Sequence, residues 1–335
     1  MILDGAVLVV RLPNWLGDTV MALPALAALR AARPDALVTV IGPWAPLLTG
    51  QAVADILLRY PGDGRKRRRL NAAMRAMRPD AAVLLPNSFA SALAARRWGA
   101  RVRLGYDTDL RRGLLTHVVA LPSPRRHQID EYAGLLEAAG IPPRPGIPEW
   151  HLGDDGEAES AVTALLADAG CAGAGPLVGL HLGAAFGSSK LWPAASYAHL
   201  ASRLRGRGLE PVLIGSPADI TMADAVSVLA NGPLASVVGR DHPEILPRLL
   251  ARLGCLVSSD TGVAHLAAAL GIPTVTLFGP TDPRLTAPRS PSGRSVEGAA
   301  PCAPCFLPRC PIDHVCMRAI SVASVVDAVD EARAA

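Results

Sequence analysis

Lysine is nearly absent from this sequence. Of its 33 basic residues only Lys66 and Lys190 are lysines, and the other 31 are arginines. Aromatic residues are also scarce, at 4% of the chain. Because proteins hold single-stranded nucleic acid largely by stacking bases on aromatic side chains, this scarcity and the lack of a recognisable binding module argue against nucleic acid as a partner. A lysine kept against so strong a bias toward arginine is a candidate for a specific role.

Long apolar runs are absent as well. No stretch approaches the ~18 consecutive apolar residues that would suggest a transmembrane helix. The first apolar run, residues 6–10, ends at Arg11 and is too short for the core of a signal peptide. We therefore expect a soluble cytoplasmic protein, in which cysteines stay reduced.

The net charge is small, at +4, but it is unevenly distributed. Residues 59–112 contain 14 Arg or Lys against 4 Asp or Glu, and the run Arg65-Lys66-Arg67-Arg68-Arg69 lies within them. Such a region favours contact with anionic phosphates or lipid head groups. A solvated basic helix face explains the same run, so the pattern predicts a basic surface and leaves its partner open.

Length and periodicity predict two α/β domains. A chain of 335 residues, half of them hydrophobic, exceeds what one core usually serves. Apolar runs alternate with helical patterns, which predicts parallel sheets with helices on both faces and a cleft at the carboxyl ends of their strands. The linker lies between the Pro-rich residues 141–148 and the small residues 171–175, so we place the domains at 1–170 and 171–335. The expected strands are 6–12, 37–41, 81–85, 118–121, 177–182, 211–214, 236–238, 255–258 and 274–278.

One turn in the second half has the residues of an anion site. Ser259-Asp260-Thr261-Gly262 follows the apolar run 255–258 and precedes a helical pattern over 263–270. A helix that begins this way presents unpaired backbone N–H groups at the positive end of its dipole, where phosphate binds well. An ordinary capped helix has the same pattern.

Two further loops of the second half are compatible with phosphate or ribose. Residues 181–193 place two glycines, Ser188 and Lys190 before a helix, without the Walker pattern of a P-loop. Asp219 follows another strand, where it could accept hydrogen bonds from ribose hydroxyls or simply cap a helix. In the first half, Asp18 follows the first strand and is either a helix cap or a general base. Together these features predict a nucleotide diphosphate in the second domain and an acceptor in the first.

A cysteine-rich segment, residues 302–316, is the other distinct feature. It contains Cys302, Cys305, Cys310 and Cys316, with His314 nearby. Four thiolates could bind a structural zinc or iron ion. Reduced buried thiols or a local disulfide are the alternatives, and the spacings are shorter than those of an ordinary zinc ribbon.

Taken together, these motifs resemble the bacterial lipopolysaccharide heptosyltransferases of glycosyltransferase family 9, most closely the heptosyltransferase II type. The resemblance runs nearly end to end. It is carried by RLPNWLGD at 11–18, MALP at 21–24, RLGY at 103–106, GSSKLWP at 187–193, SDTGVAH at 259–265 and the cysteine-rich segment through Met317.

This resemblance implies an inverting glycosyltransferase of GT-B architecture, with two Rossmann-like domains facing a central cleft. It would transfer L-glycero-D-manno-heptose from ADP-heptose to the inner-core heptose of a lipid A precursor. Asp18 is implied as the general base and Lys190 as the cation that neutralises the departing diphosphate. Donor contacts are implied for Ser188, Lys190, Asp219, Asp260, Thr261, Gly262 and His265, and acceptor contacts for Asn14, Trp15, Arg103 and Arg111.

The same resemblance implies that catalysis needs no metal or other cofactor, since helix dipoles and Lys190 can stabilise the leaving group. The basic residues 59–112 would face the anionic inner surface of the inner membrane. Two alternatives stay open at this point. One is a GT-B transferase or epimerase that uses another nucleotide sugar, with an O-antigen or protein acceptor, and the other is an inactive nucleotide-binding adaptor.

Overall fold

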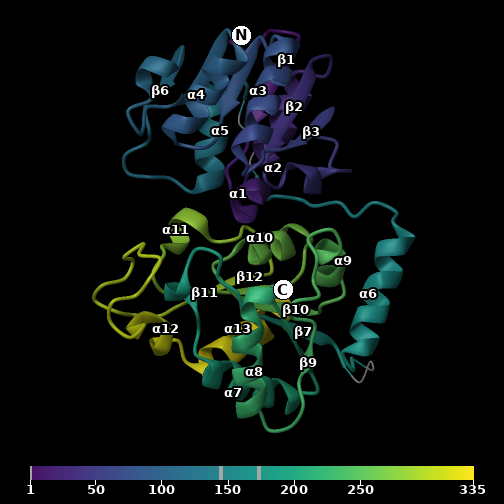
Figure 1. Cartoon of the computed structure of the whole chain (residues 1–335). Helices are drawn as coiled ribbons and strands as arrows, with labels where there is room; N and C mark the ends of the chain where they lie inside the picture. Colours follow the sequence, from purple (N-terminus) through teal and green to yellow (C-terminus); the bar gives the residue numbers. More distant parts are fainter. Residues whose placement is uncertain (1, 143–145, 172–174) are drawn as a thin grey trace. The chain divides into compact units, whose positions relative to one another are not determined.

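A computed structural model describes residues 2–142, 146–171 and 175–335. The chain divides into two compact units, Met1–Pro148 and Glu149–Ala335 (Figure 1). This division precedes the expected boundary between residues 170 and 171, because helix α6 (Gly156–Asp168) packs within the second unit. There Glu159 of α6 forms ion pairs with Arg248 at 3.5 Å and Arg252 at 2.8 Å.

The first unit is a six-stranded parallel sheet of order β3-β2-β1-β4-β5-β6. Its strands are β1 (Val7–Arg11), β2 (Leu37–Gly42), β3 (Ile56–Arg59), β4 (Ala81–Leu84), β5 (Val102–Tyr106) and β6 (His117–Val119). The central strand β1 places Val9 between Thr39 of β2 and Ala82 of β4. Both neighbours run parallel to it, which requires a helical crossover after most strands.

Helices cover both faces of this sheet. They are α1 (Leu16–Met21), α2 (Leu23–Ala32), α3 (Gly64–Met77), α4 (Phe89–Trp98) and α5 (Gln128–Ala138). Helix α3 packs against α4, and their core contains the fully buried Trp98 and Met74. Helix α2 packs against α5, which also contacts α1. The central strands β1 and β4 are therefore buried on both sides, as their continuous hydrophobic runs predict.

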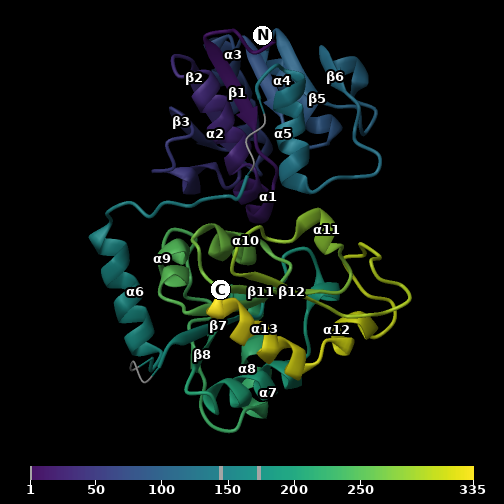
Figure 2. The ribbon, with the colours of Figure 1, turned by 180° about the vertical axis from the view of Figure 1, so that it is seen from behind.

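The second unit repeats this architecture in the order β12-β11-β10-β7-β8-β9. Its strands are β7 (Leu177–His181), β8 (Glu210–Ile214), β9 (Ala235–Ser236), β10 (Cys255–Ser259), β11 (Thr274–Phe278) and β12 (Gly293–Glu297). One face is covered by α7 (Ala194–Arg205), α8 (Ile220–Leu229) and α13 (Val322–Ala334). Helix α13 lies along β10, β11 and β12 (Figure 2). The other helices are α9 (Leu246–Ala251), α10 (Gly262–Ala269), α11 (Pro283–Thr286) and α12 (Val315–Ala319).

Three strands have no counterpart among the predicted ranges. The edge strand β3 has only four residues, all of them at least partly exposed. Strand β5 interrupts its apolar residues with Arg103 and Gly105, and the edge strand β12 has the polar sequence GRSVE. Strands at or near the edge of a sheet are less buried, so hydrophobicity alone does not reveal them.

In both sheets, the direction in which successive strands are added reverses at the centre. In the first unit the chain builds outward from β1 to β3 and then returns to β4 beside β1, and in the second it returns to β10 beside β7. Ligands of open parallel sheets bind outside the carboxyl ends of the strands at such a switch point. The loops after β1 and β4, and those after β7 and β10, are therefore the places to search for a site. No helix among the described residues is both long and apolar enough to span a bilayer.

Candidate active site

In the first unit, Asp18 lies beside the switch point. Strand β1 ends at Arg11, and Asp18 stands in the first turn of α1, where it is half-buried. The hydroxyl of Tyr132, on α5, donates a hydrogen bond to Asp18 Oδ1 at 3.0 Å. Burial raises the pKa of Tyr132 well above its ordinary value, and the Asp18 charge adds to this effect. The tyrosine thus stays protonated and acts as a donor, while the carboxylate is reachable from solvent.

The loop between β1 and α1 carries two of the predicted acceptor residues. Asn14 and Trp15 are exposed, Trp15 to 52%. A residue that the sequence reasoning did not single out, Arg11, holds this loop: its guanidinium donates to Asn14 Oδ1 at 2.8 Å and to the Leu12 carbonyl. Arg11 is buried over the ring of Tyr60, and burial lowers its pKa to about 10. The feature of the sequence that could have identified Arg11 is its position at the end of a buried strand.

The two predicted acceptor arginines, Arg103 and Arg111, are used inside the protein. Arg111 is fully buried, and its guanidinium donates to the carbonyls of Tyr106 at 2.9 Å and of Pro86. Burial lowers its pKa to about 10. Arg103 donates to the carbonyls of Ala100 and Leu114, each at 2.6 Å. The donors of Arg111 satisfy buried backbone carbonyls, which the basic sequence around it did not reveal, and its contact with an acceptor stays a prediction.

In the second unit, Lys190 and Asp260 meet at the switch point. Lys190 follows β7 and Asp260 follows β10, and their side chains form an ion pair with Nζ–Oδ2 of 2.6 Å. Both side chains are over nine-tenths buried. Lys190 also donates to the Asp260 carbonyl at 2.8 Å, and the Thr281 hydroxyl donates to Asp260 Oδ2 at 2.8 Å. A buried ion pair with these additional hydrogen bonds fixes both loops.

The turn after Asp260 begins helix α10. Thr261 and Gly262 are half-buried, and Thr261 is the N-cap, although its side chain does not cap the helix. Its hydroxyl instead lies 3.0 Å from the Ser258 hydroxyl, which lies 3.1 Å from His181 Nδ1. Burial lowers the pKa of His181 to about 4. The predicted donor residue His265 is buried on α10. The first N–H groups of α10 therefore lie in a turn that these side-chain contacts hold in place and that is partly exposed to solvent.

The loop that carries Lys190 rests on the cysteine-rich segment. Gly187 passes so close to Pro308 that a Cβ at Gly187 would lie 2.1 Å from the Pro308 carbonyl oxygen. The Ser189 amide donates to this same carbonyl at 3.2 Å. Ser188, the predicted donor contact, is exposed, whereas Ser189 is buried. Residues 302–316 thereby support one wall of the candidate site.

The four cysteines do not form the expected metal site. Among the residues that the structure describes, no group of three or more His, Cys, Asp or Glu side chains could hold a metal ion. Cys316 is buried in the core beside Met317, and a Cβ at Gly279 would lie 2.9 Å from its sulfur. Cys302 is exposed, and Cys310 Sγ accepts a hydrogen bond from the His314 amide at 3.3 Å. The residues therefore do not fit a zinc or iron ion as arranged here.

Two carboxylates lie near the carboxyl ends of β8 and β9. Asp219 Oδ2 accepts from the Ser216 amide at 2.8 Å and its hydroxyl at 2.7 Å, and a Cβ at Gly183 would lie 2.6 Å from this oxygen. Asp241 was not predicted as a site residue. Burial, and then the Asp219 charge, raise its pKa to about 7. Within the described ranges its Oδ1 atom is buried without a hydrogen-bond partner.

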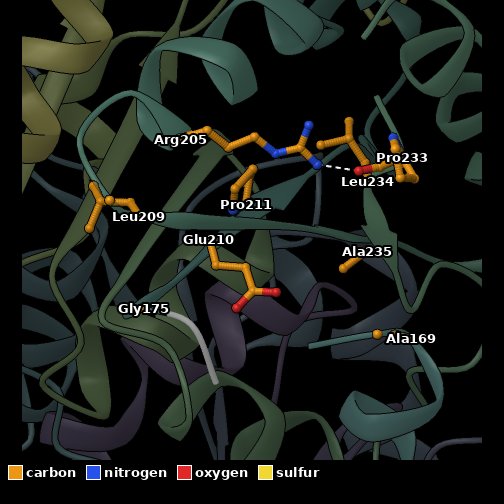
Figure 3. Close-up of a pocket in the computed structure, with 11 residues that line it drawn as sticks. Ala169, Gly175, Arg205, Leu209, Glu210, Pro211, Pro233, Leu234 and Ala235 are labelled. Carbon is orange, nitrogen blue, oxygen red and sulfur yellow. Dashed lines mark hydrogen bonds between the residues drawn. The ribbon is translucent and has the colours of Figure 1, made fainter. Parts of the chain in front are cut away.

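Two cavities occur in the second unit. One, of about 590 Å³, lies beyond the ends of β11 and β12 and is lined by Thr281, the residue that contacts Asp260. The other, of about 450 Å³, includes Arg205, Glu210 and Ala235 (Figure 3). Glu210 and Ala235 begin β8 and β9, so this second cavity lies at the amino ends of the strands, and Arg205 is bound to the Pro233 carbonyl. The first cavity adjoins the candidate site.

Comparison with known proteins shows the family of this chain. Residues 67–316 match glycosyltransferase family 9 (heptosyltransferase). The chain is 32% identical to lipopolysaccharide heptosyltransferase 2 of Salmonella typhimurium, over 85% of this chain and 86% of that protein. It is 31% identical to the Escherichia coli heptosyltransferase 2, with the same coverage.

Solved structures confirm the fold class. The structure of E. coli ADP-heptose lps heptosyltransferase II superposes with a TM-score of 0.81 and 27% identity, covering 98% of both chains. A family 9 glycosyltransferase from Veillonella parvula gives a TM-score of 0.84 at 22% identity, covering 100% of this chain and 99% of that one. The two Rossmann-like units are those of the predicted GT-B architecture. The chain belongs to glycosyltransferase family 9, the heptosyltransferases, and is a glycosyltransferase.

Proposed function

We propose that this protein transfers L-glycero-D-manno-heptose from ADP-heptose to the inner-core heptose of a lipid A or lipopolysaccharide precursor. The observation that carries the proposal is the likeness to heptosyltransferases 2 along 85% of the chain. The Asp18 carboxylate and the Lys190–Asp260 pair supply the polar groups that such a transfer needs. The likeness favours this reading over a transferase or epimerase of other nucleotide sugars and over an inactive adaptor.

The proposed acceptor side is the carboxyl edge of the first sheet. Asp18 takes the proton of the acceptor hydroxyl as the hydroxyl oxygen forms its bond to the anomeric carbon. The bond from that carbon to the β-phosphate oxygen breaks, and ADP leaves with the electron pair, so the configuration inverts. Asn14 and the exposed Trp15 ring lie four and three residues before Asp18 in the chain and offer an amide and an apolar face to a sugar.

The proposed donor side is the carboxyl edge of the second sheet. The N–H groups at the start of α10, at Thr261 and Gly262, bind the diphosphate and stabilise the charge that grows on it. Lys190 is the adjacent cation, held in place by Asp260, and Ser188 adds an exposed hydroxyl. Asp219 accepts hydrogen bonds from the ribose. No step in this scheme is assigned to a metal or cofactor.

A donor panel tests the proposal. Purified protein is incubated with a heptose-truncated lipopolysaccharide precursor and with ADP-heptose, a UDP-hexose or a GDP-hexose, and the product is identified by mass spectrometry. We expect transfer from ADP-heptose alone. Transfer from a UDP-sugar in the absence of transfer from ADP-heptose would refute the assignment. Hydrogen exchange in the presence of ADP tests which unit binds the donor. We expect ADP to protect the backbone amides of residues 181–193 and 259–265.

The acceptor is a lipid, so a membrane contact is part of the proposed function. Helix α3 carries Arg65, Lys66, Arg67, Arg68 and Arg69 on its first turns, and all five side chains are exposed. Asp63 caps the helix by accepting from the Lys66 amide at 2.8 Å. Only Met74 of this helix is buried. A helix so rich in exposed cations suits the anionic inner face of the inner membrane, with each cation near the surface contributing about 1 kcal/mol.

Vesicle sedimentation tests this contact without the acceptor. We expect binding to vesicles that contain phosphatidylglycerol, weaker binding in high salt and none to neutral vesicles. Replacing Arg67, Arg68 and Arg69 by Gln should abolish sedimentation. The same triple change at Arg203, Arg205 and Arg207, in the second unit, is the control. Equal sedimentation of both variants would contradict a role for α3.

A further inference from the structure

Tyr132 donates to the candidate base, which sets it apart from the other deeply buried tyrosines. The hydroxyls of Tyr106 and Tyr197 each donate to a backbone carbonyl, that of Glu131 at 2.6 Å and that of His181 at 3.0 Å. This is the ordinary way in which a buried tyrosine satisfies its hydroxyl. Tyr132 instead donates to a carboxylate 114 residues away in the chain, Asp18. Its hydroxyl therefore joins α5 to the first turn of α1.

The position of Tyr132 is fixed by its neighbours. The preceding residue, Glu131, is fully buried and forms a bidentate ion pair with Arg125, with bonds of 2.6 and 2.8 Å. Its carboxylate also accepts from the Arg126 amide at 3.2 Å. The residue before Tyr132 is thus held to the loop that precedes α5. A side chain so anchored has little freedom to move away from Asp18.

We propose that Tyr132 is a positioning residue, which holds the Asp18 carboxylate in the rotamer that receives the acceptor proton. The inference rests on the proposed role of Asp18 as the base. The buried phenol occupies Oδ1 as a neutral donor, and so directs the carboxylate without neutralising it. A lysine or arginine in this place would form an ion pair and oppose proton uptake. A carboxylate held in one geometry avoids the rate loss that even a small misplacement brings.

The bond also affects when Asp18 is charged. A hydrogen bond donated to a carboxylate favours its ionised form. Besides Asp18, the charged groups that act on the Tyr132 hydroxyl are Glu131 and Arg125, which are paired with each other. Removing the hydroxyl should therefore shift the acid limb of the pH–rate profile to higher pH, an effect that a purely structural tyrosine would not produce.

The test uses Tyr132→Phe in the full chain with ADP-heptose and the lipopolysaccharide precursor. We expect kcat to fall about tenfold, the value for losing a hydrogen bond to a charged group, with the KM for ADP-heptose unchanged and the acid limb moved upward. Tyr106→Phe is the matched control, since it removes a buried hydroxyl of β5 that donates to the Glu131 carbonyl and not to Asp18. It should leave both kcat and the pH profile unchanged.

A double variant separates the outcomes. If Tyr132 acts through Asp18, adding Tyr132→Phe to Asp18→Asn produces no further loss of kcat. A further tenfold loss, or a Tyr132→Phe enzyme with the kcat and pH profile of the Tyr106→Phe control, would overturn the positioning role. Full turnover by Asp18→Asn would instead overturn the proposed function. Because thermal melting of both Phe variants is measured in parallel, a folding defect is detected separately.

Discussion

Asp18 and Asp260 occupy corresponding places in the two units but differ in surroundings. Each follows a central strand at the point where its sheet changes direction. Asp18 is half-buried, and a neutral phenol donates to it. Asp260 is buried and is bound by the ammonium of Lys190 and the hydroxyl of Thr281. The same side chain in the same topological place therefore has two different sets of partners.

The difference indicates what each carboxylate can do. A carboxylate that receives a hydrogen bond from an uncharged donor and is reachable from solvent can accept a proton. A buried carboxylate in an ion pair with further hydrogen bonds instead fixes a cation and a turn. Under the proposed function, Asp18 of the first unit is the base, and Asp260 of the second supports the turn that binds the diphosphate. Three measurements test this contrast.

The largest effect is expected for Asp18→Asn. Asparagine keeps the size of the side chain and can still accept from Tyr132, but it cannot take the proton of a hydroxyl. We expect kcat to fall about 10²–10⁴-fold, the usual contribution of a general base, with no change in ADP-heptose affinity. Steady-state kinetics and calorimetric titration of ADP-heptose give the two quantities.

Asp107→Asn is the matched control. Asp107 follows β5 in the same unit, but it forms an exposed ion pair with Arg112 at 2.6 Å. Its replacement should leave kcat within twofold, roughly, because exposed pairs contribute little. Equal turnover by Asp18→Asn and Asp107→Asn would contradict the role of Asp18 as general base. The contrast between Asp18 and Asp260 would then have no consequence for catalysis.

The second effect concerns the Lys190–Asp260 pair. Lys190→Met or Asp260→Asn alone leaves one buried charge unpaired, which should lower the free energy of unfolding by about 3–5 kcal/mol. The double variant should regain most of this loss, because it leaves no charge. Urea denaturation measures all three variants. ADP-heptose binding should remain weak in the double variant, since the cation beside the diphosphate is gone.

An exposed ion pair provides the reference for the single and double variants of Lys190 and Asp260. Arg207 and Asp330 lie 3.2 Å apart on the surface of the same unit. Arg207→Met should cost about 0–1 kcal/mol. Additive losses at Lys190 and Asp260, or unchanged donor affinity in Lys190→Met, would show that this pair acts like a surface pair and not as the support of a phosphate site.

The sequence predicted the fold class and the loops of this site, because buried parallel strands have continuous apolar runs and their loops carry Gly, Ser, Thr and Asp. The partners of those residues could not be predicted. Tyr132 lies far from Asp18 in the chain, and Arg111 is in a basic stretch although its side chain is fully buried. The four clustered cysteines allowed either a metal site or reduced thiols, and packing places Cys316 in the core as a free thiol. Local patterns report strands and turns, whereas long-range contacts decide the role of a charged residue.

The smallest expected effect concerns Asp241, a half-buried residue whose Oδ1 atom is buried without a hydrogen-bond partner among the described residues. Its pKa is raised from 3.8 to about 7, so between these values the folded state binds more protons than the unfolded state. Its contribution to the free energy of unfolding therefore falls as pH rises from about 4 to 7. His181 acts in the opposite sense: its pKa is lowered from 6.5 to about 4, and its contribution rises over that range. The two effects offset each other in the wild-type protein.

Asp241→Asn removes only one of these opposing contributions. We expect the variant's melting temperature, measured relative to the wild type by differential scanning calorimetry, to increase steadily from pH 4 to pH 7. Asp224→Asn, which changes an exposed carboxylate on α8, should give a curve parallel to that of the wild type. If Asp241→Asn also gave a parallel curve, burial alone would not perturb a carboxylate at this edge. The contrast between Asp18 and Asp260 would then depend on their partners and not on their depth.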